Sequence, residues 1–314
     1  MTEIPGEGAG LSRLRLVPAI RRARGFRLYT ADGRRLVDLW QYGGRAILGH
    51  TPPAVLREMK NAAERGLFAP FPGPREGRFL KALSALLPGR SFRLFPDEAA
   101  LRRFLADSGI PAAVRDPALS PAGPSASAAV PAPVAEPLPP PVLWRPFLGD
   151  KPRQSPAASP EKNAAPFLIP VLPLPWAGAP RVLAFDAAFA AMAGAGEPLS
   201  PVILAAASRA VYDLVAAIGR GRPPFPKITR ALSRGGPWKR RGVYLSLAAV
   251  PGDEDYTALF RRFLDAGYLL PPSPGQPLIL PGELSPGEEA KLAALLNSAD
   301  TTVSAETAGM RIVP

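Results

Sequence analysis

Few of the side chains that commonly perform chemistry occur in this chain of 314 residues. Cysteine is absent, which excludes disulfides, thiolate metal sites and cysteine nucleophiles. His50 is the single histidine, so no histidine relay, zinc site or serine–histidine triad can be assembled, and we expect a structural role for it. The segment from Gly219 to Pro224 has neither of the glycine-rich phosphate-loop fingerprints. The amines that could form a covalent intermediate are Lys60, Lys81, Lys151, Lys162, Lys227, Lys239 and Lys291.

The charge balance is strongly basic, with 38 Lys and Arg against 26 Asp and Glu and a net charge of +12. Such a balance can indicate binding to nucleic acid or to an anionic surface. Here 31 of the basic residues are arginine, in a chain also rich in Ala, Pro and Gly, as a GC-rich coding sequence produces. Arginines are densest between Arg13 and Arg27, without the alternating aromatic residues of a platform for single strands. Nucleic acid is therefore not an expected partner.

The expected compartment is the cytoplasm. Residues Met1 to Gly10 have no apolar core of a secretory signal, and cysteine is absent. No stretch reaches the ~18 consecutive apolar residues that a membrane span needs. A membrane is therefore not an expected partner either.

Proline divides the chain into three parts, because 19 of the 42 prolines lie between Pro111 and Pro180. Such a segment favours extended polyproline II or disorder over helix and sheet. The sequence predicts an N-terminal segment over 1–110, a Pro/Ala-rich linker or poorly ordered region over 111–180, and a C-terminal part over 181–314. Two apolar islands interrupt the linker, and one of them, Phe167–Leu172, could form a strand.

On both sides of the linker the hydrophobic pattern predicts alternating strands and helices. Strand-like runs occupy 26–29, 34–39, 92–95, 182–185 and 243–247, and helical patterns occupy 53–65, 79–87, 98–106, 200–219, 256–267 and the residues after 285. The first two strands flank Ala31-Asp32-Gly33, which is a hairpin signal. Ser285-Pro286-Gly287-Glu288 has the pattern of a capping box. The alternation indicates an α/β protein.

Segments near both ends of the chain resemble one family. Gly25–Leu39 is similar to the opening hairpin of class III aminotransferases, and Ala46–Pro53 is similar to their G-H-x-H-P element, with Pro52 in place of the second histidine. Tyr256–Ser273 resembles their helix that ends at "G-V" and leads to "P-P-S". Leu284-Ser285 resembles the closing "L-S…H-T" element without its histidine. The greatest likeness is to glutamate-1-semialdehyde aminomutases.

The resemblance implies a shortened remnant of the pyridoxal-phosphate-dependent transferase fold type I. Its α+β small domain would be built from the N- and C-terminal segments, with the Pro/Ala-rich segment as an insert. Family members use pyridoxal phosphate, which requires a Schiff-base lysine, an aspartate at the pyridine nitrogen and donors for the phosphate. Arg181–Ala188 resembles the strand ending in "F-D-E-V", which makes Asp186 the candidate cofactor-binding residue.

Two of the family's cofactor requirements are missing from the sequence. Phe92–Ala99 aligns with the strand and "N-S-G-T-E-A" turn, but Pro96-Asp97 replaces the donors, and an aspartate repels phosphate. The Schiff-base lysine should lie between Asp186 and the "G-N-P-L"-like Gly196–Leu199, where no lysine occurs. No catalytic residue can therefore be assigned, and the cofactor is expected only if the family function survives.

Three functions remain open. The first is an aminotransferase-derived protein without catalysis that forms a homodimer, or a heterodimer with an aminotransferase homologue, since the family builds its sites across a dimer. The second is an active aminotransferase or aminomutase that uses a displaced lysine, Lys227 or Lys239, both expected in a Pro/Arg-rich loop. The third is a basic module that binds nucleic acid or protein partners.

Overall fold

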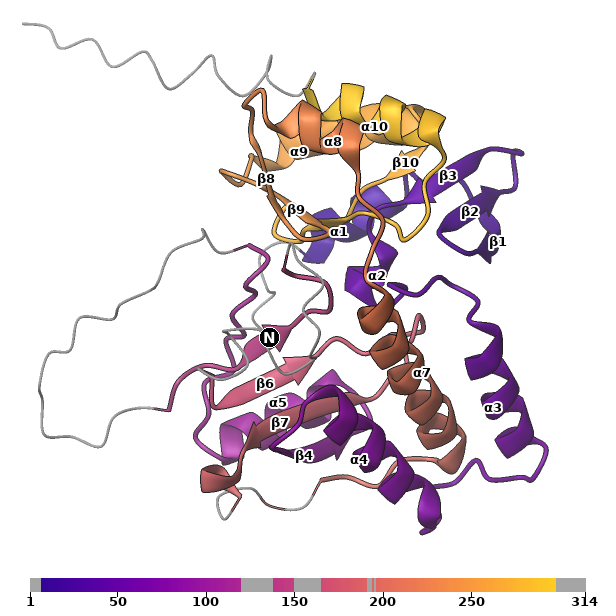
Figure 1. The fold of residues 1–314 in the computed structure, drawn as a ribbon, viewed down its shortest axis with the longest axis vertical. Helices are drawn as coiled ribbons and strands as arrows, with labels where there is room; N and C mark the ends of the chain where they lie inside the picture. Colours follow the sequence, from indigo (N-terminus) through magenta and orange to yellow (C-terminus); the bar gives the residue numbers. More distant parts are fainter. Residues whose placement is uncertain (1–6, 120–137, 150–164, 191–193, 195, 298–314) are drawn as a thin grey trace, which may run out of the picture. The chain divides into compact units, whose positions relative to one another are not determined.

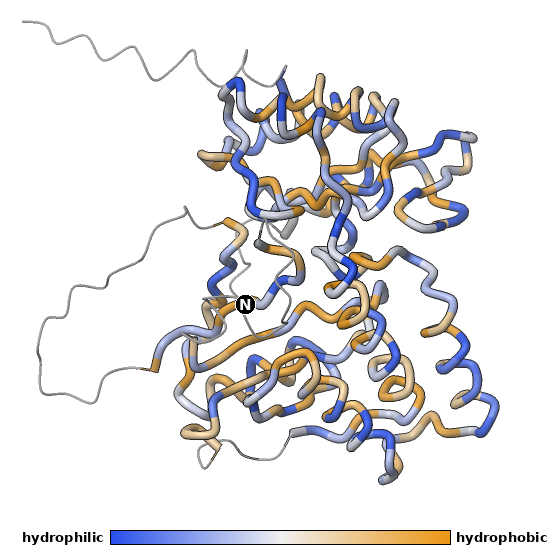
Figure 2. The backbone as a smooth tube through the Cα atoms, in the orientation of Figure 1, coloured by the Kyte–Doolittle hydropathy of each residue, from blue (hydrophilic) through white to orange (hydrophobic). Residues whose placement is uncertain are grey.

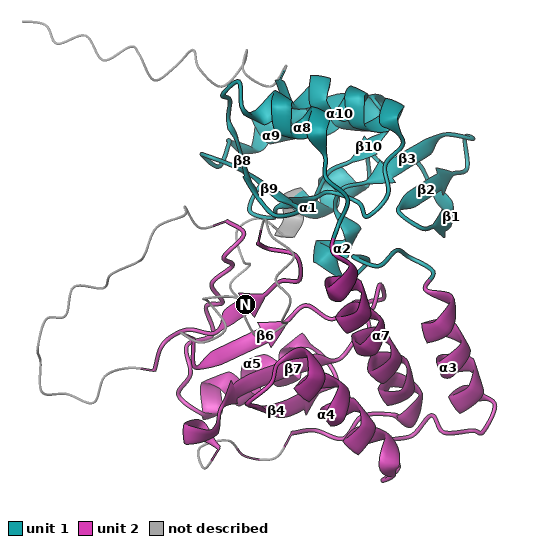
Figure 3. Ribbon diagram, in the orientation of Figure 1, with its two compact units in different colours: residues 1–51, 222–314 teal, residues 52–221 magenta. Residues whose placement is uncertain are grey.

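The computed structural model describes residues 7–119, 138–149, 165–190, 194 and 196–297. The chain divides into two compact units, shown in different colours in Figure 3. Unit 1 consists of residues 1–51 and 222–314, and unit 2 of residues 52–221. Unit 1 is therefore built from the two ends of the chain, as the family resemblance implies for the small domain.

Unit 1 contains a four-stranded sheet that joins its N- and C-terminal parts (Figure 1). Its strands, in spatial order, are β1 (Ile20–Arg24), β2 (Arg27–Thr30), β3 (Arg35–Asp38) and β10 (Tyr268–Leu269). The predicted hairpin is confirmed: β2 pairs antiparallel with β3, and Gly33 in the turn has a φ of +83° that favours glycine. β10 pairs parallel with β3, so the C-terminal part completes this sheet.

The rest of unit 1 is a second, three-stranded sheet and its helices. The strands, in spatial order, are β11 (Leu278–Ile279), β9 (Tyr244–Leu247) and β8 (Trp238–Arg241); the helices are α1 (Glu7–Leu14), α2 (Gln41–Gly44), α8 (Pro226–Leu232), α9 (Asp253–Asp265) and α10 (Pro286–Asn297). The capping box is confirmed at the start of α10, where Ser285 N donates to Glu288 Oε2 over 2.8 Å and Glu288 N donates to Ser285 Oγ over 3.2 Å.

The expected Pro/Arg-rich loop around Lys227 and Lys239 is wrong, because α8 and β8 occupy this stretch. Ile228 of α8 and Trp238 of β8 are buried, although basic residues surround them in the sequence. Burial of these two side chains stabilises a helix and a strand that the Pro/Arg-rich composition does not predict.

Unit 2 is a four-stranded sheet with helices. The strands, in spatial order, are β4 (Arg90–Phe95), β7 (Arg181–Asp186), β6 (Phe167–Pro170) and β5 (Val142–Trp144); the helices are α3 (Pro53–Ala63), α4 (Pro74–Leu86), α5 (Glu98–Asp107), the 3₁₀ turn Ala187–Phe189 and α7 (Pro201–Arg220). β7 pairs antiparallel with β4 and β6, whereas β6 and β5 are parallel. Figure 2 shows β6 and β7 as hydrophobic stretches, and Phe167, Leu183 and Phe185 form a core with α5.

The structure divides the Pro-rich part of the chain differently from its composition. Within 111–180, the described residues 138–149 and 165–180 belong to unit 2 and contribute β5 and β6 to its sheet. Phe167 to Pro170 are all buried, so both faces of this short strand are covered. The Ala/Pro/Ser-rich stretch 120–135 lies outside the described residues.

Helix α7 is the helix of unit 2 against which α3 and α4 pack. Ser200 caps its start by accepting a hydrogen bond from Val202 N over 3.2 Å. α3 and α4 both pack along it, and Ala62 of α3 meets Val202 and Ala205 at a contact made of small side chains. By length and composition alone α7 could span a membrane, but half of its most apolar window is buried within the protein. Its packing is that of a core helix.

Candidate functional site

Asp186 ends strand β7 and is held by an arginine on the neighbouring strand. The register of the β4–β7 pair places Arg90 opposite Asp186, and Arg90 Nη1 lies 2.9 Å from Asp186 Oδ1. Only 6% of the Arg90 side chain is exposed, and the same nitrogen donates to the carbonyls of Ala165 and Pro166 over 2.9 and 3.1 Å. The Asp186 carboxylate is therefore neutralised by a nearly buried guanidinium, which competes with any pyridinium for its charge.

The turn that aligns with the family's phosphate-binding turn carries carboxylates. Asp97 is the N-cap of α5, and its Oδ1 accepts a hydrogen bond from Ala100 N over 2.8 Å. Glu98 follows in the first turn, where Arg181 Nε donates to its Oε2 over 2.6 Å. Burial raises the pKa of Glu98 more than any other single effect, but the hydrogen bonds and charges of Arg181 and Arg102 together outweigh burial and lower that pKa. Both carboxylates are compatible with the positive end of the helix dipole.

These residues do not fit pyridoxal phosphate. A phosphate at the start of α5 would meet the carboxylates of Asp97 and Glu98 in place of free N–H donors. Pro96, directly before the cap, has no N–H to offer. A pyridinium at Asp186 would share the carboxylate with the guanidinium of Arg90, which already occupies Oδ1.

The lysines that the structure describes are all exposed. Lys227 of α8 donates its Nζ to the Pro286 carbonyl over 2.8 Å, and Lys60 of α3 pairs with Glu64 one turn later over 3.6 Å. The others among the described lysines are Lys81, Lys239 and Lys291. Lys151 and Lys162 lie outside the described residues. Among the five described lysines, none has the desolvated setting that converts an ammonium into a nucleophile.

His50 has the structural role expected from the sequence. Its Nε2 lies 2.7 Å from Oδ2 of Asp38, which is 1% exposed, and its backbone N–H donates to the Gly25 carbonyl over 2.8 Å. Gly49 has a φ of +96°, and a Cβ there would lie 3.3 Å from the backbone of Gly25. The G-H pair of the family element thus allows two segments of unit 1 to approach closely.

Two arginines of the arginine-rich segment between Arg13 and Arg27 form ion pairs within unit 1. Arg13 is 2% exposed; it is ion-paired with Asp253 and donates to the Pro272 carbonyl over 2.8 Å. Arg27 donates to both carboxylate oxygens of Glu288, over 3.0 and 2.7 Å. These two guanidiniums join N-terminal to C-terminal segments of the unit and are not available to a polyanion.

Comparisons with known proteins agree with this fold. No family model matches the chain. A protein of Treponema pallidum (strain Nichols) described as uncharacterized is 27% identical over 307 residues, covering 83% of this chain and 88% of that protein. The glutamate-1-semialdehyde 2,1-aminomutase of Sorangium cellulosum (strain So ce56) is 42% identical over 69 residues, which are 22% of this chain and 16% of the aminomutase.

Solved structures of aminotransferases align with most of the chain. The ornithine δ-aminotransferase of Plasmodium falciparum gives a TM-score of 0.62 at 12% identity, covering 90% of this chain and 92% of that one. The β-phenylalanine aminotransferase of Variovorax paradoxus gives 0.61 at 16% identity, covering 93% of each. The fold is that of the pyridoxal-phosphate-dependent aminotransferases. Within the chain, a segment of 69 residues is similar to glutamate-1-semialdehyde 2,1-aminomutases.

Proposed function

We propose that this chain is an aminotransferase-like protein that does not catalyse pyridoxal-phosphate chemistry and acts by binding a partner. The observation that carries the proposal is the start of α5, where Asp97 caps the helix with its own carboxylate. A phosphate there would lose the N–H donor that Asp97 already occupies and would gain a like-charge neighbour.

Two further features support the loss of catalysis. Asp186 is paired with Arg90, which weakens the attraction of its carboxylate for a protonated pyridine nitrogen. No lysine occurs in the sequence between Asp186 and Gly196, where the resemblance to the family expects one. Pyridoxal phosphate is accordingly not the resident ligand.

The partner in this proposal is a second copy of the chain or an aminotransferase homologue, and the compartment is the cytoplasm. The relatives with solved structures are aminotransferases by name, and the resemblance to their family implies sites built across a dimer. Sedimentation of the purified chain, alone and mixed with such a homologue, tests this part. Two species that sediment independently as monomers would contradict it.

The first test of the catalytic part is the visible absorbance spectrum of the purified chain, with and without added pyridoxal phosphate. Borohydride reduction and peptide mapping then locate any lysine that forms an imine with the cofactor. We expect no stable visible band and only scattered low labelling of exposed lysines. Inorganic phosphate in excess serves as the competitor that separates a phosphate-anchored site from chance imine formation.

A stable band trapped on one lysine would overturn the proposal and name the reactive residue. Lys227→Ala and Lys239→Ala are the variants to compare, because these are the displaced lysines that the sequence offers. If either variant abolished both the band and the conversion of amino acid and oxo-acid pairs, the chain would be an active enzyme.

A further inference from the structure

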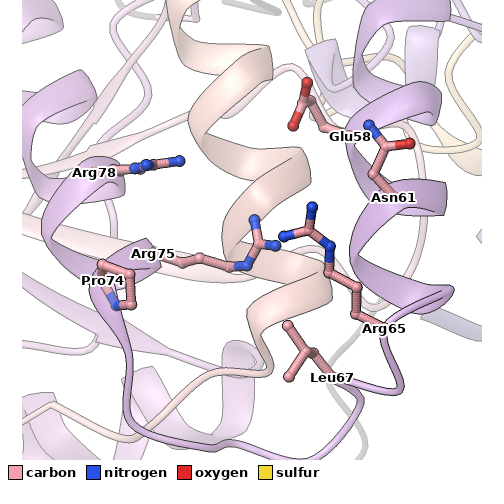
Figure 4. A pocket seen from close by; sticks show the side chains of 7 residues that line it. All are labelled: Glu58, Asn61, Arg65, Leu67, Pro74, Arg75 and Arg78. Atoms are coloured by element: carbon pink, nitrogen blue, oxygen red, sulfur yellow. The ribbon is translucent and has the colours of Figure 1, made fainter.

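Three arginines gather in a hollow of unit 2 that belongs to none of the positions discussed above. The hollow has a volume of about 390 Å³ and lies between α3 and α4, which both pack along α7. Arg65 follows the end of α3, whereas Arg75 and Arg78 lie in the first turns of α4. Figure 4 shows the guanidinium groups of Arg65 and Arg75 pointing toward one another, with that of Arg78 directed into the same space.

The charge of this hollow is uncompensated within the described part of the chain. None of the three guanidinium groups forms an ion pair or a hydrogen bond with another described residue. Glu58 is the single acidic residue among those that line the hollow. A guanidinium remains charged at any physiological pH, so the lining carries a net charge of two positive units. Cations that face one another across a shared space repel, and an anion placed between them relieves the repulsion.

The start of α4 adds donors of the same kind. Gly73 is its N-cap and provides no side-chain acceptor, in contrast to Asp97 at α5. Pro74 occupies the first helical position, so the free N–H groups begin at Arg75. Because Pro74 and Arg75 line the hollow, an anion held by the arginines would lie near the positive end of a helix of 13 residues.

An apolar hollow of about 410 Å³ adjoins the arginines. The two hollows share Leu67, Pro74 and Arg75, and the second is lined mainly by Pro and by large apolar side chains, among them Phe71 and Leu204. Phe71 is 54% exposed, so its ring is accessible to a ligand in this second hollow. Both volumes lie within the ~300–1,000 Å³ typical of sites for small molecules.

We propose that this pair of hollows binds a small phosphate monoester with an apolar or aromatic body. The phosphate would be held by Arg65, Arg75 and Arg78, since guanidinium groups match the geometry of its oxygens. The apolar body would lie against Leu67 and Phe71 in the adjoining hollow. The arginines converge on one space from two helices, which favours a compact anion over the extended backbone of a nucleic acid.

The test is calorimetric titration of the full chain with phenyl phosphate, inorganic phosphate, phenol and a single-stranded oligonucleotide. The variants are Arg65→Gln and Arg75→Gln. Arg57→Gln is the matched control, because Arg57 is an exposed arginine of α3 that does not line the hollow. Thermal unfolding of each variant checks that the fold is retained.

We expect phenyl phosphate to bind, each hollow variant to weaken it about tenfold, and Arg57→Gln to change it less than about twofold. Inorganic phosphate should bind more weakly than phenyl phosphate, and phenol should not bind detectably. Equal affinities for the two phosphates would overturn the role of the apolar hollow. Loss of affinity that is the same for all three variants, or binding of the oligonucleotide alone, would overturn the site itself.

Discussion

Replacing Glu288 by glutamine should loosen unit 1 in a pH-dependent way. Arg27 of β2 donates two hydrogen bonds to this carboxylate, so it connects the N-terminal sheet to the start of α10. Burial would raise the pKa of Glu288, but the hydrogen bonds from Arg27 and Ser285 outweigh burial and lower it from 4.5 to about 2. Glutamine keeps an oxygen for Ser285 N but loses the charge that faces Arg27.

The magnitude follows from the difference between the folded and unfolded pKa. Because the pKa is lower in the folded state, the carboxylate stabilises unit 1 above pH 4.5, and this contribution is lost as the pH falls toward 2. The Glu288 side chain is 11% exposed, so solvent screens the pair only modestly. We expect Glu288→Gln to cost about 2–3 kcal/mol at pH 7 and about 1 kcal/mol at pH 3.

Hydrogen exchange followed by mass spectrometry is the assay, with peptides from β2 and α10 as reporters. Peptides from β4 and β7 of unit 2 serve as the internal reference. Glu283→Gln is the control, because Glu283 lies 3.9 Å from the same Arg27 but is 77% exposed, and its loss should cost less than ~0.5 kcal/mol. Equal protection of the parent and Glu288→Gln at pH 7 would refute the reasoning. A loss of protection in Glu288→Gln that is as large at pH 3 as at pH 7 would also refute the reasoning.

Two further predictions concern the stability of unit 2. Asp97→Ala should cost about 1 kcal/mol in urea unfolding because α5 loses its cap, whereas Asp97→Asn should cost less than about 0.5 kcal/mol; equal losses would show that charge, not capping, is at work. Gly196→Ala should cost about 1–3 kcal/mol in thermal unfolding, since a Cβ there would lie 2.8 Å from the Leu94 carbonyl oxygen. Gly219 in α7 is the control, because a Cβ there has open space around it. Gly219→Ala should leave the free energy of unfolding unchanged or raise it by up to about 1 kcal/mol. Similar melting temperatures for the two glycine variants would contradict this account.

Local signals predicted most elements within a few residues. The turn at Gly33 and the capping box at Ser285 depend only on neighbouring residues, and the structure contains both. The amino-acid composition predicted the secondary structure less well than these local patterns did. The proline content predicted a linker over 111–180, whereas the apolar run Phe167–Leu172 within it predicted the strand that the structure contains as β6.

Pairs that are distant in the sequence could not be predicted in this way. Arg90 neutralises Asp186 only because β4 and β7 pair antiparallel in one register, and a single sequence does not specify that register. The convergence of Arg65 with Arg75 and Arg78 depends on how α3 and α4 pack on α7. The helix predicted over 79–87 begins in the structure at Pro74, so the sequence did not place Arg75 and Arg78 at a helix start.

The parallel pairing of β3 with β10 also sets an order of events during synthesis. Val37 pairs with Tyr268, which leaves the ribosome after roughly 230 further residues, or about 10–50 s at typical translation speeds. Unit 2 is complete well before then and can fold first, while Leu36 and Val37, both buried in the final structure, await their partner strand. Until β10 has been synthesised, the N-terminal hairpin of the nascent chain thus carries an unpaired strand edge with two apolar residues, a feature that favours aggregation.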